Sequence, residues 1–213
     1  MPNTPHTAAD ALRRLIEGNR AFVTGLHAGE PLSRTEFLDL SREQRPFAIV
    51  LGCSDARVPA EIVFNQGLGD LFVIRVAGNV VAPSQVGSVE FAASRYACKL
   101  VVVMGHSSCG AVLATIDALN NPGSRESRNL QSIVNRVRPS VESLMRTELA
   151  HDHEALVHHA VRANVAASVD HLRHGSELLE RLIASEGLVV VGAEYSLATG
   201  EVDFFDRGGL DID

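Results

Sequence analysis

Four short, continuous apolar segments constrain the fold of this 213-residue chain more than any other feature. They lie at residues 47–52, 71–76, 100–104 and 188–192 and consist mainly of Val, Ile, Leu and Phe. Apolar runs without alternation are typical of parallel strands covered on both faces. Segments with apolar residues at helical spacing separate them, at 83–97, 109–120, 128–147 and 154–185. This order predicts an α/β fold, with a mainly parallel central β-sheet flanked by helices.

The two ends of the chain complete this plan. Residues 8–23 have the pattern of an amphipathic helix that ends near Gly25, and residues 26–45 are polar and mixed, as in a loop with some helix. Residues 201–205 follow a Thr-Gly turn and are predicted to form an antiparallel edge strand. We expect one domain over 1–213, with an N-terminal helical arm to about residue 45 and an α/β core over about 46–213.

Composition excludes several classes of protein. The formal net charge is -7, and an acidic chain without a dense basic run is not expected to bind nucleic acid. No segment approaches the ~20 apolar residues that a membrane span needs, and the N-terminus lacks the apolar core of a signal peptide. We therefore expect a cytoplasmic protein. Its three cysteines fit no disulfide framework, and in a reducing compartment they favour metal binding or catalysis.

Two short polar segments each follow a predicted strand directly. Cys53-Ser54-Asp55-Ala56-Arg57 follows the first strand, and Gly105-His106-Ser107-Ser108-Cys109-Gly110 follows the third and opens a helix. In an extended chain Cys53, Asp55 and Arg57 would point to one side. Both segments lie at the carboxyl ends of strands, where open α/β sheets form their ligand sites.

Thiolates and an imidazole are good zinc ligands, and three protein ligands leave a fourth position for water, as in catalytic zinc sites. We therefore predict a zinc site on Cys53, His106 and Cys109, with a water acidic enough to form hydroxide near neutral pH. Asp55 has two possible roles. Held by Arg57, it could accept a proton from that water; released from Arg57, it could become a fourth ligand and close the site.

Taken together, these segments resemble the β-class carbonic anhydrases. The resemblance lies in CSDARVPAE (53–61), GDLFVIRVAGNVV (69–81) and GHSSCGAV (105–112), and extends to LIEGNRAFV (15–23) and GLVVVGAEYSLATGEVDFF (187–205). It implies one zinc ion per subunit on the three ligands named above, with Asp55 and Arg57 as a catalytic dyad. It also implies the reversible hydration of CO₂ to bicarbonate and a proton, and a homodimer or homotetramer with the active-site cleft at the dimer interface.

The chain departs from the family pattern at three positions. Ala56 replaces a common serine, facing away from Cys53 in an extended chain. Val50 occupies the place of a tryptophan that some members use, together with an arginine matched by Arg75, in a regulatory bicarbonate site. The chain has no tryptophan, so we expect no such regulation. Gln66 stands one position away from a glutamine that contacts substrate in other members.

Other interpretations stay open at this point. The same zinc chemistry could act on carbonyl sulfide or carbon disulfide, and a permanent Asp55 ligand would make the zinc purely structural. A dithiol redox protein is disfavoured because the sequence has no C-x-x-C. Cys98 is interpreted as a buried apolar residue. The six histidines between residues 151 and 174 are interpreted as solvated or interface residues, and residues 66–70 as a turn.

Overall fold

A five-stranded sheet forms the centre of the computed structural model, which describes residues 7–25, 44–121, 123 and 127–212. The strands lie in the order β2-β1-β3-β4-β5. Their bounds are β1 Ala48–Gly52, β2 Leu71–Arg75, β3 Leu100–His106, β4 Val189–Tyr195 and β5 Val202–Asp206. The first four are parallel, and β5 runs antiparallel to β4 at the edge. The predicted α/β fold and its antiparallel edge strand are confirmed.

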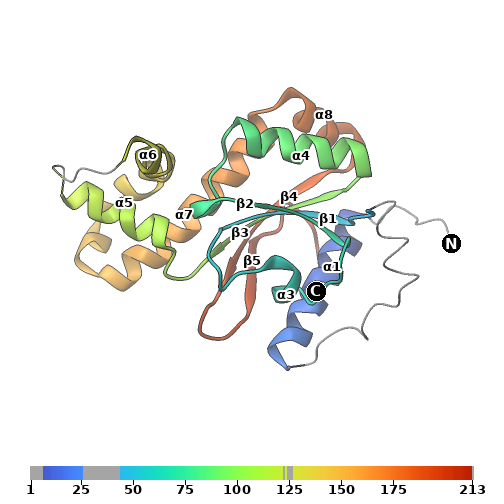
Figure 1. Ribbon diagram of the computed structural model, residues 1–213, viewed down its shortest axis with the longest axis horizontal. Coiled ribbons are helices and arrows are strands. Elements are labelled where there is room, and N and C mark those ends of the chain that lie inside the picture. Colours follow the sequence, from blue (N-terminus) through green and yellow to red (C-terminus); the bar gives the residue numbers. More distant parts are fainter. Residues whose placement is uncertain (1–6, 26–43, 122, 124–126, 213) are drawn as a thin grey trace.

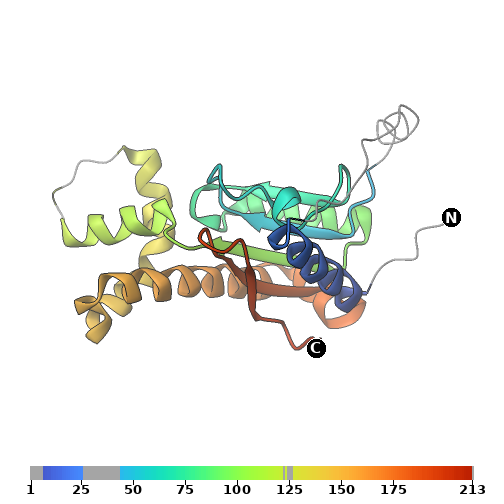
Figure 2. The same cartoon turned by 90° about the horizontal axis from the view of Figure 1, so that it is seen from below.

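Helices cover both faces of this sheet (Figures 1 and 2). On one face lie α1 (Ala8–Val23) and the short α3 (Ala60–Val63); on the other lie α4 (Pro83–Tyr96), α7 (His153–His174) and α8 (Glu177–Glu186). Helices α5 (Gly110–Asn120) and α6 (Arg128–Glu142) pack with the first turns of α7 beyond the sheet. Short 3₁₀ turns η1 (Ala77–Asn79), η2 (Leu144–Arg146) and η3 (Glu148–His151) complete the elements of the described residues.

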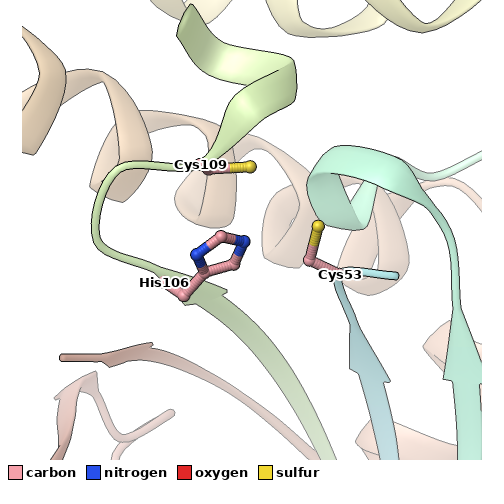
Figure 3. A group of neighbouring side chains, drawn as sticks. All are labelled: Cys53, His106 and Cys109. Carbon is pink, nitrogen blue, oxygen red and sulfur yellow. The ribbon is translucent and has the colours of Figure 1, made fainter. Parts of the chain in front are cut away.

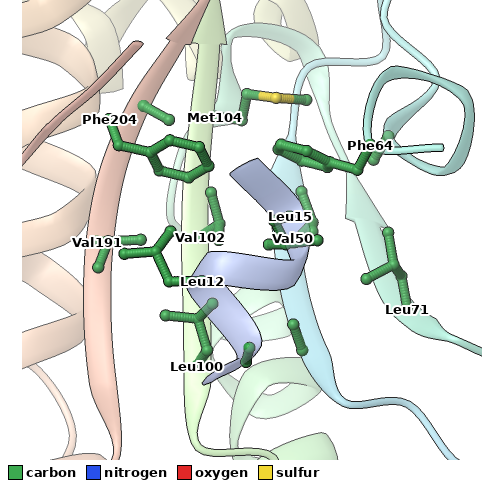
Figure 4. Close-up of a cluster of buried hydrophobic side chains, with 14 of the residues drawn as sticks. Leu12, Leu15, Val50, Phe64, Leu71, Leu100, Val102, Met104, Val191 and Phe204 are labelled. Atoms are coloured by element: carbon green, nitrogen blue, oxygen red, sulfur yellow. The ribbon is translucent and has the colours of Figure 1, made fainter. Parts of the chain in front are cut away.

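The apolar character of the strands is explained by this coverage. Every residue of β1 and β3 is buried. Alternate residues contact opposite layers: Val50 and Val102 pack against Leu12 and Leu15 of α1, as Figure 4 shows. The intervening residues pack against α4, α7 and α8. Burial on both faces is therefore why these segments show no apolar–polar alternation.

The segment 154–185 differs from the single helix that its apolar stripe predicts. It forms α7 and α8, separated at Gly175 and Ser176. Ser176 caps α8, because its Oγ accepts a hydrogen bond from the backbone N–H of Leu179 at 3.2 Å. Apolar residues of both helices pack in the same cluster, so the apolar stripe continues across the break. The periodicity of the sequence therefore gives no sign that the helix is interrupted. Similarly, α6 ends at Glu142, and η2 and η3 follow.

The N-terminal helix has the bounds that its periodicity predicts. Thr7 and Asp10 form a capping box at its start. Near its end the buried Asn19 joins it to the core: its side-chain amide donates to the carbonyls of Val63 and Gly200 and accepts from the N–H of Val202. Most of the predicted loop at 26–45 lies outside the described residues. No described helix is long and apolar enough to cross a membrane; the cytoplasmic location stays a prediction.

Candidate metal centre

Cys53, His106 and Cys109 meet at the point where the strand order reverses. From β1 the chain continues to β2 on one side, whereas from β3 it continues to β4 on the other. Cys53 directly follows β1, His106 is the last residue of the adjacent β3, and Cys109 is the N-cap residue of α5. The crevice at such a switch point is where open α/β sheets bind ligands. The sheet topology therefore joins two segments that are far apart in sequence.

The three side chains point toward a common space, as Figure 3 shows. Their candidate ligand atoms all lie within 4.8 Å of one another, and the three residues are buried. Within the described part of the chain, they are the sole group of three His, Cys, Asp or Glu side chains close enough to share an ion. Two thiolates and a neutral imidazole match the donor set that zinc prefers.

The imidazole of His106 has one nitrogen engaged and one free. Its Nδ1 lies 3.0 Å from the carbonyl oxygen of Ser107, and donation to that oxygen fixes the tautomer. Its Nε2 is buried without a hydrogen-bond partner. A buried polar atom without a partner is costly, and a metal ion would satisfy this one. Metal-ligating histidines commonly donate their second N–H in this way, so the residues present fit a metal.

The local fold explains how the loop after β3 presents its ligands. Ser108 adopts φ 55°, a left-handed conformation that turns the chain sharply between His106 and Cys109. The hydroxyl of Ser107 accepts a hydrogen bond from the N–H of Leu197 at 3.0 Å. The N–H of Ser107 donates to the carbonyl of Tyr195. These contacts hold the loop against the end of β4.

Electrostatics favour a thiolate at Cys53. Its pKa is lowered, chiefly by a hydrogen bond from the Cys109 thiol, with further contributions from His106 and the N–H of Gly78, while burial opposes the shift. The same contact raises the pKa of Cys109. Burial alone would lower the pKa of His106, but the neighbouring Cys53 thiolate raises it above its ordinary value. The pocket thus attracts positive charge, which a divalent cation would supply.

Asp55 is held by Arg57. The Nε and Nη2 atoms of Arg57 donate to the two carboxylate oxygens at 2.9 and 2.7 Å, and its backbone N–H donates at 3.0 Å. These hydrogen bonds keep the pKa of Asp55 well below its usual range. Asp55 Oδ2 nevertheless lies 3.8 Å from His106 Nε2. The carboxylate therefore borders the three-residue cluster while bonded to Arg57.

Arg75 has a structural role that the sequence alone does not predict. Its Nε donates to the carbonyl of Cys53 at 3.0 Å and its Nη2 to the carbonyl of Asp55 at 2.6 Å. It thereby braces the loop that carries both side chains. The sequence shows only an arginine at the end of a predicted strand, and its target depends on the pairing of β1 with β2, which places Arg75 beside Gly52.

The other residues singled out by the sequence have partners outside the cluster. Cys98 is buried, donates to the carbonyl of Pro46, and burial raises the pKa of its thiol to about 12. Gln66 is engaged elsewhere: it accepts from Arg14 Nε and donates to the carbonyl of Phe64. His158 lies 3.6 Å from Glu194 and stacks edge-on against His159. None of the described histidines from 151 to 174 belongs to a group able to hold a metal.

The comparisons with known proteins all identify one protein family. A family model described as carbonic anhydrase matches residues 48–202. The chain is 40% identical over 205 residues to a carbonic anhydrase of Mycolicibacterium smegmatis, covering 95% of both chains. It is 38% identical to carbonic anhydrase 2 of Mycobacterium tuberculosis, covering 98% of this chain and 97% of the relative.

Solved structures agree with the fold. A β-carbonic anhydrase from Coccomyxa, solved in complex with acetazolamide, superposes with a TM-score of 0.68 at 26% identity, over 91% of this chain and 86% of that one. A tetrameric β-carbonic anhydrase from Sordaria macrospora gives a TM-score of 0.72 at 24% identity, over 83% and 87%. With the matched family model and the mycobacterial relatives, the conclusion is that this chain belongs to the β-carbonic anhydrases, lyases that hydrate CO₂.

Proposed function

We propose that the chain holds one zinc ion per subunit through Cys53, His106 and Cys109 and uses it to hydrate CO₂ to bicarbonate and a proton. The observation that carries this proposal is the free Nε2 of His106, buried without a hydrogen-bond partner and directed at two buried thiols. A zinc ion bound there would supply the Lewis acidity that makes a water nucleophilic near neutral pH.

Asp55 and Arg57 would then orient the water beside the cluster. Asp55 is the hydrogen-bond acceptor for that water, because its carboxylate borders the cluster and stays ionised beside Arg57. Arg57 is the positioning partner: its two side-chain bonds and one backbone bond fix both carboxylate oxygens. A fixed carboxylate needs little reorganisation when it accepts a hydrogen bond from the water and orients it. CO₂, which carries no charge, needs only a small apolar space beside the cluster.

The pairing of Asp55 with Arg57 supports a site whose fourth position is free for water. If Asp55 were a fourth ligand, it would have to leave both guanidinium bonds, which are 2.9 and 2.7 Å long. Stopped-flow CO₂ hydration at pH 7 and near pH 9, measured with the zinc content, tests this. Fast, zinc-dependent hydration at both values is expected. Activity at the higher pH alone would indicate an Asp55-closed state, and bound zinc without hydration at either pH would contradict the proposal.

Replacing the carboxylate isolates its role. Asp55→Ala is expected to keep the zinc and lose about 10²–10³-fold in kcat, the usual cost of removing one positioned hydrogen-bonding group. Asp117→Ala, which removes an exposed carboxylate from α5, is the matched control and should hydrate CO₂ like the wild type. Full activity in Asp55→Ala would show that the dyad has no part in the reaction.

A homodimer or homotetramer is the assembly that we propose. The described surface exposes Ile62, Leu68 and Phe91, each more than half exposed, and among the described strands β5 has no neighbour beyond it. Exposed apolar groups and unpaired strand edges are typical of surfaces that associate. Light scattering across a concentration series tests the assembly, and a monomer at every concentration would contradict it.

A further inference from the structure

The turn behind Cys53 contacts the proposed ligand directly. The 3₁₀ turn η1 follows β2, and the N–H of Gly78 donates to Cys53 Sγ at 3.3 Å. A bond of this kind stabilises a thiolate and fixes the direction of the sulfur. Its geometry depends on the orientation of the turn, since Gly78 carries its N–H as part of the backbone.

This turn has an unusual backbone that needs outside support. Gly78 has φ 69° and Asn79 has φ 44°, both in the left-handed region. Such conformations persist when surrounding contacts hold them. A side chain at position 78 is also excluded, because a Cβ there would lie 2.8 Å from the Cβ of Ala111. Packing from α5 therefore closes one side of the turn, and its carbonyl groups face α7.

Two polar side chains of α7 hold those carbonyls. Asn164 Nδ2 donates to the carbonyl of Gly78 at 2.8 Å, and Ser168 Oγ donates to the carbonyl of Asn79 at 3.1 Å. Asn164 and Ser168 are 3% and 6% exposed. They are four residues apart, so both project from the same face of the helix. Two successive peptide groups of the turn are thus fixed from one rigid element.

The position of these residues argues for a specific role. They lie within the apolar stripe of α7, where Val161, Val165 and Leu172 pack against the core. Polar groups at such positions cost free energy unless they are hydrogen-bonded. The backbone carbonyls of Gly78 and Asn79 are their partners here. The chain therefore places these polar atoms where they reach the turn whose Gly78 N–H donates to Cys53.

We propose that Asn164 and Ser168 are positioning residues for the metal ligand Cys53, acting through the backbone of Gly78 and Asn79. This inference rests on the proposed metal site and extends it to α7, a helix that supplies none of the three candidate ligands. Its consequence is that metal affinity and ligand geometry depend on α7 as well as on the two ligand loops.

Ser168→Ala and Asn164→Ala test the proposal, with Ser168→Thr as the rescue variant because threonine keeps the hydroxyl. Residues 164 and 168 also line a cleft of about 670 Å³, which leaves room for the added methyl group. The probe is Co²⁺, which reports thiolate bonding through its charge-transfer absorption. Affinities for Co²⁺ and Zn²⁺ are measured by competition with a chromophoric chelator on the full-length chain.

Both alanine variants are expected to bind metal about 10–100-fold more weakly, the range seen when a group supporting a ligand is removed. They should also show an altered Co²⁺–thiolate band. Ser168→Thr should restore both. Val169→Ala, which removes buried apolar contacts from the same helix without touching the turn, controls for general destabilisation and should keep the wild-type spectrum.

The outcomes separate the two proposals. If the wild type binds Co²⁺ and the folded alanine variants match it in affinity and spectrum, the positioning role is wrong and the metal site stands. The positioning role is equally wrong if Val169→Ala loses as much affinity as Asn164→Ala. If the wild type itself binds neither metal, the proposed metal site fails, and the positioning role fails with it. Circular dichroism confirms beforehand that each variant is folded.

Discussion

Gly105 lies next to the proposed metal ligand His106, at a point where α7 packs against the sheet without room for a side chain. It precedes His106 in β3, and a Cβ placed on it would lie 2.6 Å from Val165 Cγ2 and 3.3 Å from Val161 Cγ1. Carbon atoms pack best at about 3.5–4.0 Å. Gly105→Ala therefore requires β3 and α7 to separate by ~1 Å, because the side chains of valine have few alternative rotamers and cannot move aside easily.

The free-energy cost follows from this contact. Overpacking a core costs about 1–3 kcal/mol, and the short distance to Val165 places this case near the upper end. A Gly→Ala change also restricts the unfolded chain, which returns about 0.4–1 kcal/mol. We expect a net loss of about 2 kcal/mol in the free energy of unfolding. For a chain of this length that corresponds to a fall in Tm of roughly 4–8 °C.

Urea unfolding of the apoprotein, followed by circular dichroism, measures the change in a double-mutant cycle. Val165→Ala removes the clashing methyl groups, so the double variant should be at least ~1 kcal/mol more stable than the sum of the single changes predicts. Gly87→Ala is the control: its Cβ meets nothing within 4 Å in the middle of α4, so it should stabilise by about 0.5–1 kcal/mol. Additive effects of Gly105→Ala and Val165→Ala would refute the steric reasoning.

Three further perturbations have defined outcomes. The pKa of the Asp55 carboxyl group, followed by ¹³C NMR, should lie well below the ordinary aspartate value of ~3.9. It should move toward that value in Arg57→Ala, since Arg57 lowers the pKa of Asp55. An unchanged titration in the variant would show that Arg57 is not the cause. The buried Cys98 thiol has its pKa raised from 9.0 to about 12, so the unfolded state ionises first and stability falls as pH rises through that window. Cys98→Ala should lose less stability than the wild type between pH ~8 and ~10.5, and an equal loss would contradict this. Asn19→Ala leaves three backbone groups without their hydrogen-bond partner, at a cost of about 1 kcal/mol each in the free energy of unfolding. The control Asn135→Ala, at an exposed position, should cost under ~0.5 kcal/mol. Equal melting temperatures of the two variants would show that water replaces the Asn19 amide.

The strands and the three metal-ligand candidates are the parts that the sequence predicts best. Short continuous apolar runs rich in β-branched residues favour strands covered on both faces, as β1 and β3 are. Once the sheet is parallel, Cys53 and His106 must lie at the same edge. The order of the strands is what brings them side by side, and no local pattern encodes it.

The parts that could not be predicted depend on contacts between distant segments. The turn at 77–79 takes its shape from Asn164 and Ser168, more than eighty residues later in the chain. Arg75 acquires its role from strand pairing, and the break at Gly175 is hidden by a continuous apolar stripe. In each case the deciding interaction is tertiary, whereas periodicity and turn chemistry describe only neighbouring residues.

The separation of Cys53 from Cys109 along the chain has a consequence for how the protein would acquire the proposed metal ion. Small zinc modules gather ligands from neighbouring residues and fold around the ion. Here the ligands meet only after β1 and β3 have paired, and long-range parallel pairing is among the slower events of folding. We therefore expect metal uptake to follow assembly of the sheet, and the apoprotein to be the species that receives the ion. Metal binding would then stabilise a protein that has already folded, slowing its unfolding and leaving its folding rate nearly unchanged.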